Sequence, residues 1–395
     1  MQMRVLLAID DASLGGGQMH VLLLAKYLPK DSFEVEIATE SEGWLVDEAR
    51  NLSIVVHQIA ISNDLTWQSF DCIRKLLKSQ RFDILHTHGG TAGFWIRLMA
   101  IGLAKRPTIV HTYHGLHYLN ISQTSVKAIQ QKFKRAVFKQ IDRVLSTHTD
   151  RMICVCRSDY DKAIDVGVAH PDRTSIVYNG IEIDKFSHSL ENESEWHQHR
   201  ERARETFGID PTKFVFGSVG RLHEQKGHEF LLQAFVKVDS HARLAIVGDG
   251  ELKDELIELA DELQISDRVS FLGARADIAE FLSAIDVFVL PSLWEGQPIA
   301  LLEALALRKP CIVSNVNGIP EIIENGVNGY LVNPRDIGEL ARMMNLVIEE
   351  PILVREFSEH EVSALDPKFF AQNMATEIAN IYLSYTHIRS NCAIR

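Results

Sequence analysis

The chain has 395 residues, of which 46% are hydrophobic and 24% charged, and its formal net charge is −12 at pH 7. This length predicts two or three domains with large cores, and the composition is that of an ordinary soluble globular protein. Because nucleic-acid binding needs a dominant basic surface, the negative charge argues against nucleic acid as a general partner, although it leaves room for a local basic patch.

The cysteines and the start of the chain indicate a cytoplasmic protein. The five cysteines are scattered, and Cys154 and Cys156 lack the spacing of a metal knuckle, so we expect reduced core residues. Met3 leads directly into a predicted strand without the pattern of a signal peptide. No apolar run reaches the roughly 18–20 residues that a membrane-spanning helix needs.

In the first half of the chain, apolar strands alternate with helical patterns. The first strand, Met3–Ile9, is followed by the turn Gly15-Gly16-Gly17 and by a helix over Met19–Tyr27. Glycines let the backbone approach a bound group closely, so Gly16 and Gly17 are candidates for substrate binding, although a flexible turn has the same pattern. Further strands are predicted at Val35–Thr39, Ile54–Gln58, Asp83–Thr87, Thr108–Tyr113, Met152–Cys156 and Ser175–Tyr178.

Histidines gather where two of these strands end. His86 and His88 lie at the end of one strand, and His111, His114 and His117 lie at the end of the next. Because no Asp, Glu or Cys joins them at ligand spacing, we expect no metal site there. His114, which a glycine follows, is the candidate to face a substrate.

A D-x-D motif is also present. Asp159-Tyr-Asp161 matches the pattern of metal-dependent sugar transferases. In this chain it follows Ser158, so it is more typical of a helix start with Ser158 as the N-cap and acidic residues in the first turn. We therefore predict no metal ligands here.

A basic helix with an apolar stripe is predicted over residues 125–145. Six lysines and arginines stand against one acid in this range, which is unusual in a chain of net charge −12. The pattern suggests an anionic membrane surface as a partner, where a lipid-linked acceptor would be presented. A helix that packs on the core and exposes a solvated basic face has the same pattern.

The alternation of strands and helices begins again in the second half. Strands are predicted at Phe214–Val219, Leu244–Val247, Val269–Leu272, Val287–Leu290 and Cys311–Ser314, with helices at Glu229–Val236, Gly250–Leu263, Ile278–Ala284 and Ile299–Ala306. Two such series predict an α/β protein with two doubly wound parallel sheets. We expect domains at 1–179 and 180–365, with the polar stretch Ser187–Arg204 as a linker or exposed helix, and a C-terminal helix in 366–395.

Two cations follow the first strand of the second half. Ligands of doubly wound sheets bind at the carboxyl ends of strands, and Arg221 and Lys226 lie five residues apart at such an end. Arginine can bind a phosphate through two N–H groups and lysine adds a mobile charge, so the pair predicts a phosphate clamp. A charged pair on a solvated loop is the alternative.

Two glutamates follow the strand Asp286–Leu290. Glu295 lies in a tight turn before a helix whose first position suits Pro298, and Glu303 lies about a turn and a half into that helix. The N–H groups at the helix start favour an anion, and carboxylates accept hydrogen bonds from hydroxyls. The motif therefore predicts a site for a phosphorylated polyol, whereas a surface loop followed by a solvated helical glutamate is the alternative.

The order and spacing of these motifs resemble the retaining glycosyltransferases of family 4 (glycosyl transferases group 1), which have the GT-B fold. The resemblance covers nearly the whole chain and includes Gly15-Gly16-Gly17, His86-Thr-His88-Gly89, Thr112-Tyr-His114-Gly115, Tyr178-Asn179-Gly180, Gly220-Arg221, Lys226-Gly227, Val247-Gly248-Asp249-Gly250, Phe271-Leu-Gly273, Glu295 to Glu303 and Asn328-Gly329. It implies two Rossmann-like domains with a cleft between them. The nucleotide sugar would bind mainly to the second domain and the acceptor to the first, and the C-terminal helix would cross back to the first domain.

The resemblance also implies roles for individual residues. Arg221 and Lys226 would bind the donor diphosphate, Glu295 the hydroxyls of the transferred sugar, and Glu303 the ribose. Such enzymes need no metal and no cofactor besides the nucleotide-diphosphate sugar. The implied catalytic residues are His114, Arg221, Lys226 and Glu295, and the implied substrate-binding residues are Gly16, Gly17, Asn179, Gly220, Arg275 and Glu303.

The expected function is therefore that of a metal-independent, retaining hexosyltransferase. It would move a sugar to a glycan or lipid-linked acceptor in the biosynthesis of a surface polysaccharide, lipopolysaccharide or glycolipid, in the cytoplasm or peripherally on the inner face of the membrane. Many family members have a bulky apolar residue where this chain has Gln297, which leaves the sugar open. The sequence also does not decide between a UDP-sugar and a GDP-sugar as the donor. The alternatives are a nucleotide-sugar epimerase of the same fold and a non-catalytic nucleotide-binding protein.

Overall fold

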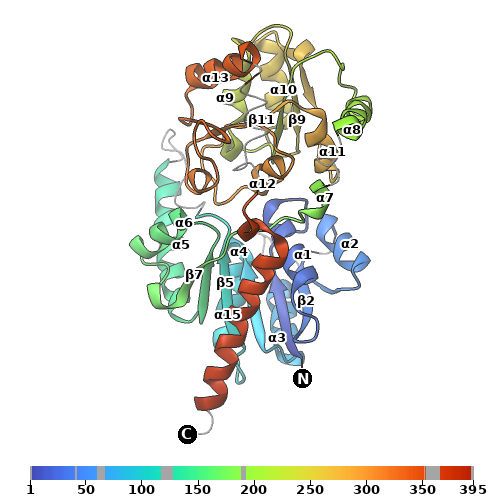
Figure 1. Cartoon of the computed structure of the whole chain (residues 1–395). Coiled ribbons are helices and arrows are strands. Elements are labelled where there is room, and N and C mark those ends of the chain that lie inside the picture. The colour runs from blue at the N-terminus through green and yellow to red at the C-terminus, as the bar shows by residue number, and fades with distance from the viewer. Residues whose placement is uncertain are drawn as a thin grey trace. The chain divides into compact units, whose positions relative to one another are not determined.

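The computed structural model describes residues 2–40, 42–59, 67–116, 128–187, 193–350, 352 and 365–392 (Figure 1). The chain forms two compact units, Met1–Gly180 with Lys368–Arg395, and Ile181–Pro367. The first unit is therefore built from both ends of the chain. Within the described residues, each unit contains one parallel sheet whose strands mostly alternate with helices, which confirms the predicted fold class.

The helices and strands of the first unit follow the predicted alternation. They are β1 (Met3–Ala8), α1 (Gly16–Tyr27), β2 (Phe33–Thr39), α2 (Trp44–Asn51), β3 (Val55–Gln58), α3 (Trp67–Ser79), β4 (Ile84–His88), α4 (Gly90–Ile101), β5 (Thr108–Tyr113), α5 (Ala128–Thr147), β6 (Arg151–Cys154), α6 (Arg157–Asp165), β7 (Thr174–Ile176) and α15 (Ala371–Cys392).

In the described part of this unit, seven parallel strands form one sheet in the order β3-β2-β1-β4-β5-β6-β7. The chain first builds outward from β1 to β3 and then continues with β4 on the other side of β1. Loops after β1 and β4 therefore leave in opposite directions, and such a switch point opens a crevice at the carboxyl edge of the sheet.

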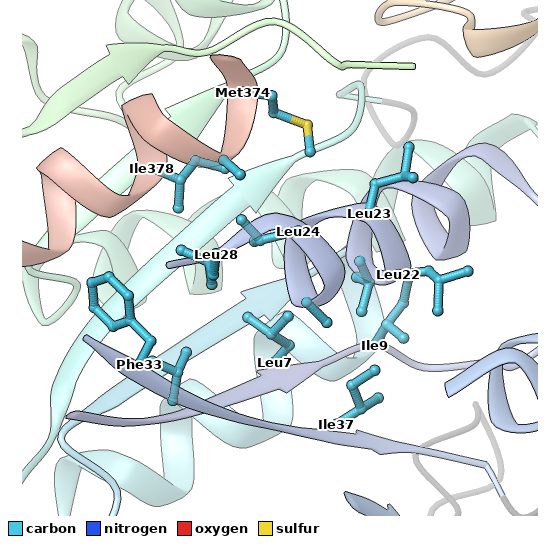
Figure 2. Close-up of a cluster of buried hydrophobic side chains, with 14 of the residues drawn as sticks. Leu7, Ile9, Leu22, Leu23, Leu24, Leu28, Phe33, Ile37, Met374 and Ile378 are labelled. Carbon is cyan, nitrogen blue, oxygen red and sulfur yellow. The ribbon is translucent and has the colours of Figure 1, made fainter. Parts of the chain in front are cut away.

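Helix α15 contributes to the core of the first unit. Met374, Ile378 and Tyr382 are buried in the same cluster as Leu28 of the α1 end, and Figure 2 shows Met374 and Ile378 beside the α1 leucines. The Tyr382 hydroxyl also forms a 2.6 Å hydrogen bond with Nδ1 of His86. Because full burial of one such side chain stabilises by about 1.5–3 kcal/mol, α15 is an integral part of this unit.

The second unit repeats the alternation. Its helices and strands are α7 (Asp184–Ser187), α8 (Glu193–Thr206), β8 (Val215–Val219), α9 (His228–Phe235), β9 (Arg243–Val247), α10 (Lys253–Glu262), β10 (Val269–Phe271), α11 (Ile278–Ala284), β11 (Val287–Leu290), α12 (Ile299–Ala306), β12 (Cys311–Ser314), β13 (Gly329–Val332) and α13 (Ile337–Glu349). In its described part, six parallel strands lie in the order β10-β9-β8-β11-β12-β13, so its switch point lies between β8 and β11.

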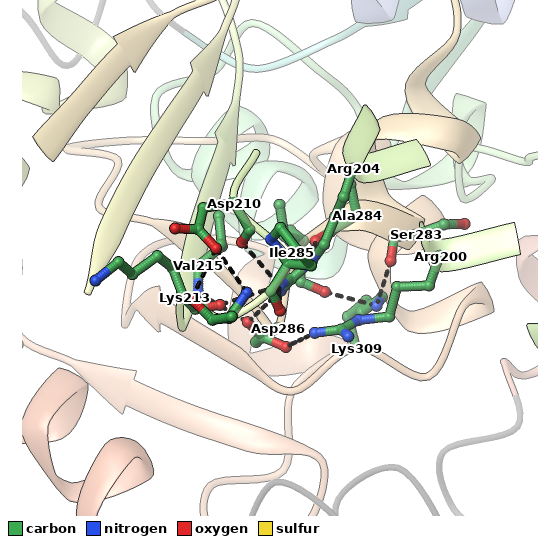
Figure 3. Close-up of polar contacts among 12 residues, drawn as sticks. Arg200, Arg204, Asp210, Lys213, Val215, Ser283, Ala284, Ile285, Asp286 and Lys309 are labelled. Atoms are coloured by element: carbon green, nitrogen blue, oxygen red, sulfur yellow. Dashed lines mark hydrogen bonds and ion pairs between the residues drawn. The ribbon is translucent and has the colours of Figure 1, made fainter. Parts of the chain in front are cut away.

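A polar network attaches α8 to this sheet (Figure 3). Arg204 is 2% exposed, and it donates from Nε to the Ala284 carbonyl at 2.9 Å and from Nη2 to Asp286 at 2.8 Å. Arg200 pairs with the other oxygen of Asp286, and Lys309 donates to the backbone carbonyl of Ile285 nearby. From Glu193 on, the stretch predicted as a linker or exposed helix is therefore helix α8, which a buried arginine attaches to the sheet.

Candidate active site

In the second unit, the candidate residues lie at the switch point between β8 and β11. The two strands pair directly, with Val287 opposite Phe216, while β9 and β12 lie on their outer sides. The loops after β8 and β11, residues 220–227 and 291–298, therefore diverge from adjacent positions at the carboxyl edge. These are the loops that carry Lys226 and Glu295.

Lys226 and Glu295 form an ion pair that joins the two loops. The Lys226 Nζ atom lies 2.6 Å from Oε1 of Glu295, which is 5% exposed. The same carboxylate accepts hydrogen bonds from Ser292 Oγ at 2.6 Å and from Gln225 Nε2 at 3.3 Å. Three donors thus hold Glu295 in one orientation, which prepares it to accept hydrogen bonds from ligand hydroxyls. Sequence reasoning missed Gln225 and Ser292 because single polar loop residues give no pattern.

Glycines let the loops of this site come close together. Gly227 has φ 66°, and a Cβ there would overlap the carbonyl oxygen of Pro291 in the other loop. Gly248, after β9, has φ 149°, and a Cβ there would overlap the carbonyl oxygen of Gly220. Gly220 itself leaves room for the stem of Lys226, since a Cβ at Gly220 would lie 3.1 Å from Lys226 Cδ. Glycine is therefore required sterically at positions 227 and 248, where the loops meet backbone to backbone.

The two candidate arginines pair with other acids. Arg221 has an exposed side chain that lies 3.4 Å from Glu251 after β9. Arg275, after β10, donates from Nε to Asp277 at 2.8 Å and covers the Phe207 ring at 4.6 Å. Among the contacts of the described residues, neither arginine reaches Glu295. An exposed ion pair contributes only about 0–1 kcal/mol, so Arg221 can exchange Glu251 for a phosphate at little cost.

Glu303 occupies a different environment from Glu295. It is the fifth residue of α12, which begins at Ile299 with Pro298 as its N-cap, so the prediction of Pro298 as the first helical residue is wrong by one position. Glu303 is half-buried, and burial raises its pKa to about 8 against the opposing charge of Lys185. The uncharged carboxyl therefore prevails at pH 7, and it can donate as well as accept a hydrogen bond.

In the first unit, the glycine turn starts helix α1. Gly16 and Gly17 are its first two residues, and the first N–H groups of a helix have no acceptor within the helix. A Cβ at Gly17 would lie 3.8 Å from Cδ2 of His114, so the two residues are neighbours. A helix N-terminus beside an imidazole suits an anionic or polyhydroxylated ligand.

His114 belongs to a cluster of three imidazoles that the sequence only partly predicted. The His20 ring of α1 lies 4.7 Å from the His114 ring and 5.3 Å from the His88 ring, centroid to centroid. Nδ1 of His88 lies 3.1 Å from Nε2 of His114, and Nδ1 of His20 lies 2.9 Å from Oδ1 of Asn179. His20 was missed because a lone histidine on an apolar helix stripe is typical of a core residue.

Burial decides the charge of these imidazoles. It lowers the pKa of His20 to about 4 and the pKa of His88 well below its usual value, so both rings are neutral at pH 7. His86 and His111 are structural residues, since they bond to Thr112 at 2.7 Å and Thr87 at 2.9 Å within the sheet. His117 lies outside the described residues.

An acidic group at the same edge of the sheet was not predicted. Asp10 and Asp11 follow β1, and Glu40 follows β2. The pKa of Asp10 is raised, mainly by burial and secondly by the charge of Asp11. The pKa of Glu40 is also raised, mainly by burial and secondly by the charges of Asp11 and Asp10. The Asp10 carboxylate faces the backbone at Gly89, where a Cβ would lie 3.5 Å from Oδ1. These acids offer hydrogen-bond acceptors near the start of α4.

The two acids of the D-x-D motif lie on helix α6 (Arg157–Asp165). Helix α6 is capped by Cys156, whose Sγ accepts a 3.4 Å hydrogen bond from the Asp159 N–H, so the prediction of Ser158 as the cap is wrong. Asp159 is fully buried, whereas Asp161 is exposed and pairs with Arg157 at 3.0 Å. The two carboxylates lie in different environments.

Helix α5 exposes apolar side chains in its described half. Val137, Phe138 and Val144 are 40%, 52% and 53% exposed. The predicted apolar stripe therefore does not pack wholly on the core. Residues 125–127 and the side chains of 128–135 lie outside the described residues.

Sequence comparisons point to one family of proteins. The model of Glycosyltransferase Family 4 matches residues 14–185, and that of Glycosyl transferases group 1 matches residues 199–361. The chain is 31% identical over 352 residues to the UDP-Gal:alpha-D-GlcNAc-diphosphoundecaprenol alpha-1,3-galactosyltransferase of Escherichia coli, with 86% of each protein covered. It is 27% identical over 370 residues to the putative glycosyltransferase EpsD of Bacillus subtilis, with 91% of each covered.

Solved structures share the fold over almost the whole chain. Anabaena Alr3699/HepE in complex with UDP and glucose has a TM-score of 0.82 at 21% identity, covering 97% of this chain and 100% of that one. WaaG, a glycosyltransferase involved in lipopolysaccharide biosynthesis, has a TM-score of 0.77 at 16% identity, covering 96% and 99%. Within the described residues, no helix has both the length and the apolar character needed to cross a membrane.

Proposed function

This chain belongs to glycosyltransferase family 4 and has the GT-B fold, and we propose that it moves a hexose from a nucleotide-diphosphate sugar to a glycan or lipid-linked acceptor, with retention and without a metal. The observation that carries the proposal is the Lys226–Glu295 pair at the β8/β11 switch point. It combines a cation for a diphosphate with an oriented carboxylate for the attached sugar.

The cations of the second unit bind the donor diphosphate in this proposal. Lys226 stays beside Glu295, and Arg221 leaves its exposed contact with Glu251 to bind the phosphates. Both then stabilise the negative charge that develops on the leaving group, and charges fixed in advance are the most effective means of doing so. Gly220 leaves the space in which the Lys226 stem lies.

Hydroxyl groups of the donor bind to carboxylates. Glu295 accepts hydrogen bonds from the transferred sugar and Glu303 from the ribose, while His114 bonds near the reacting carbon. The acceptor oxygen attacks the face from which the diphosphate departs, and a leaving phosphate oxygen takes its proton. We therefore assign no protein nucleophile and no general base. Asn179 orients the histidine cluster through His20.

The acceptor is proposed to be lipid-linked. The name of the Escherichia coli relative includes a diphosphoundecaprenol-linked acceptor and UDP-Gal, which supports a UDP-hexose donor and a lipid-linked glycan acceptor here. Such an acceptor lies at a membrane surface, and the exposed apolar residues of α5 support peripheral binding through residues 125–145 on the cytoplasmic face. Asp10 is proposed to accept a hydrogen bond from an acceptor hydroxyl.

Transfer assays with the purified full chain and a panel of nucleotide sugars test the function. We expect Lys226→Met and Glu295→Gln each to lower kcat about 10²–10³-fold, as is typical when one stabilising group is removed. Lys75→Met is the matched control, because Lys75 forms an exposed ion pair of the same 2.6 Å length with Asp71 on α3. NMR of the product reports the anomeric configuration, and EDTA tests the need for a metal.

The same assays separate the competing functions. An epimerase would interconvert nucleotide sugars without an acceptor, and a non-catalytic binding protein would turn over none of them. Either result, or full activity in both Lys226→Met and Glu295→Gln, contradicts the proposal.

A further inference from the structure

Three imidazoles converge in the first unit from three separate elements. One ring nitrogen from each of His20, His88 and His114 lies within 4.8 Å of the corresponding atoms of the other two. The 3.1 Å between His88 Nδ1 and His114 Nε2 is close to the roughly 3.3 Å that separates two ligands of a tetrahedral zinc ion with bonds of about 2.0 Å. The other separations between the ligand nitrogens, of up to 4.8 Å, would have to shorten by side-chain rotation to complete a three-nitrogen site.

One of these rings carries a buried nitrogen whose hydrogen-bonding capacity is not used. Nε2 of His20 is buried and forms no hydrogen bond within the described part of the chain. A buried polar atom without a partner costs about 1–3 kcal/mol, so its retention calls for a ligand.

The tautomer of His20 also suits a metal. Its Nδ1 lies 2.9 Å from the amide oxygen of Asn179, which can only accept, so Nδ1 carries the proton and Nε2 presents a lone pair. Metal-bound histidines almost always donate their other ring N–H to an oxygen in this way. Neutral rings are needed as well, and burial keeps His20 and His88 neutral at pH 7.

We propose that His20, His88 and His114 bind one divalent d-block cation of the Zn²⁺ type, with a fourth position open to water or to a ligand oxygen. Imidazole ligands favour Zn²⁺ or Co²⁺ over Mg²⁺, which prefers oxygen. The expectation of no metal site rested on the lack of an acid or cysteine beside the strand-end histidines, and His20 of α1 supplies the third ligand instead.

Metal binding and sugar transfer would exclude each other. His114 is the proposed contact of the reacting sugar, and an ion that holds its imidazole withdraws it from the donor. Zn²⁺ therefore acts as an inhibitor of the proposed metal-independent transfer. The binding site stands independently of the proposed reaction, because its occupancy is measured without turnover.

Titration of the metal-free full chain with Co²⁺ tests the site. We expect one equivalent of Co²⁺ to give the intense visible absorption of four-coordinate cobalt, Zn²⁺ to displace it, and Mg²⁺ to give no signal. His20→Ala and His88→Ala remove the absorption and weaken Zn²⁺ binding at least tenfold. The matched control is His241→Ala, since His241 is an exposed histidine of the second unit that contacts Asp239.

A milder variant protects the test against misfolding. Asn179→Ala keeps all three ligands and removes the acceptor that holds the His20 tautomer, and we expect about a 10–100-fold loss of Zn²⁺ affinity. Zn²⁺ should also inhibit the wild type, with recovery on adding EDTA, and should inhibit His20→Ala much less. Binding that persists in both His20→Ala and Asn179→Ala, or a wild type without four-coordinate Co²⁺, overturns the site.

Discussion

Glu295 and Glu303 are two carboxyl groups of one motif that the structure places in opposite electrostatic environments. Glu295 is held by Lys226, Ser292 and Gln225, whereas the pKa of Glu303 on α12 is raised by burial, which the charge of Lys185 only partly offsets. One is prepared to accept hydrogen bonds as a carboxylate, and the other is kept as an acid at neutral pH. This difference in protonation follows from tertiary contacts, which the sequence of the motif from Glu295 to Glu303 does not reveal.

Glu303 should make the second unit less stable as the pH rises. Its folded pKa of about 8 lies above the unfolded value of 4.5, so between these values the folded state holds a proton that the unfolded state has released. The free energy of unfolding of the wild type therefore falls from pH 4.5 to 8. Glu303→Gln removes this fall and is expected to gain on the order of 1–2 kcal/mol at pH 8, less than the full shift implies because Glu303 keeps some solvent contact.

Thermal melting at pH 5 and pH 8 measures this effect, and Glu258→Gln on the exposed face of α10 is the control. The same substitution should leave nucleotide-sugar binding at pH 7 nearly unchanged, because the glutamine amide, like the uncharged carboxyl, both donates and accepts hydrogen bonds. Equal pH dependence in Glu303→Gln and the wild type would show that the carboxyl titrates normally.

Most elements with a clear apolar period could be predicted from the sequence. Strands Val287–Leu290 and Cys311–Ser314 begin and end where the pattern predicts, and because the loops after β8 and β11 leave from strand ends, Lys226 and Glu295 could be assigned to one edge. Helix α4 was missed because it begins with glycines and is apolar on nearly all sides. Strand β13 was missed because Gly329 suggests a break, yet glycine is needed there, since a Cβ would lie 2.6 Å from the Cys311 carbonyl oxygen.

Helix α8 shows how one side chain determines the position of an element. Arg204 donates to the Ala284 carbonyl, to Asp286, and from Nη1 to the backbone carbonyls of Asp210, Pro211 and Lys213. The buried position of Arg204 could not be predicted from the sequence, because the residue pattern of α8 is that of a solvated helix.

Arg204→Met should therefore be destabilising, by about 1–3 kcal/mol, because it leaves the buried Ala284 carbonyl without this donor and removes one of the two arginines that pair with Asp286. Arg200→Met is the matched control: Arg200 contacts the same aspartate from a more exposed position, and its loss should cost less than about 1 kcal/mol. Denaturant unfolding of the second unit measures both values, and similar losses in the two variants would contradict the assignment.

For the whole molecule, the distribution of charge matters more than the total. A chain of net charge −12 is repelled by an anionic membrane unless a local surface of opposite sign faces it. Asp142 is the one acidic residue between residues 125 and 145. It is buried and pairs with Arg97 at 2.7 Å, so it does not offset the basic residues of helix α5. The exposed Phe138 and Val144 add apolar area to the same helix.

We expect the full chain to float with vesicles that contain anionic lipid and not with neutral vesicles. Added salt should release the protein from the vesicles, because it shortens the electrostatic screening length, which is about 10 Å at 0.1 M. Phe138→Ser should weaken this binding roughly fivefold, because part of an aromatic side chain no longer enters the interface. Ile257→Ser is the control, since Ile257 is similarly exposed, at 43%, on α10 of the second unit. Equal flotation with neutral lipid, or an equal effect of both substitutions, would remove the membrane contact and leave the transferase proposal untouched, because the residues at the β8/β11 switch point do not depend on it.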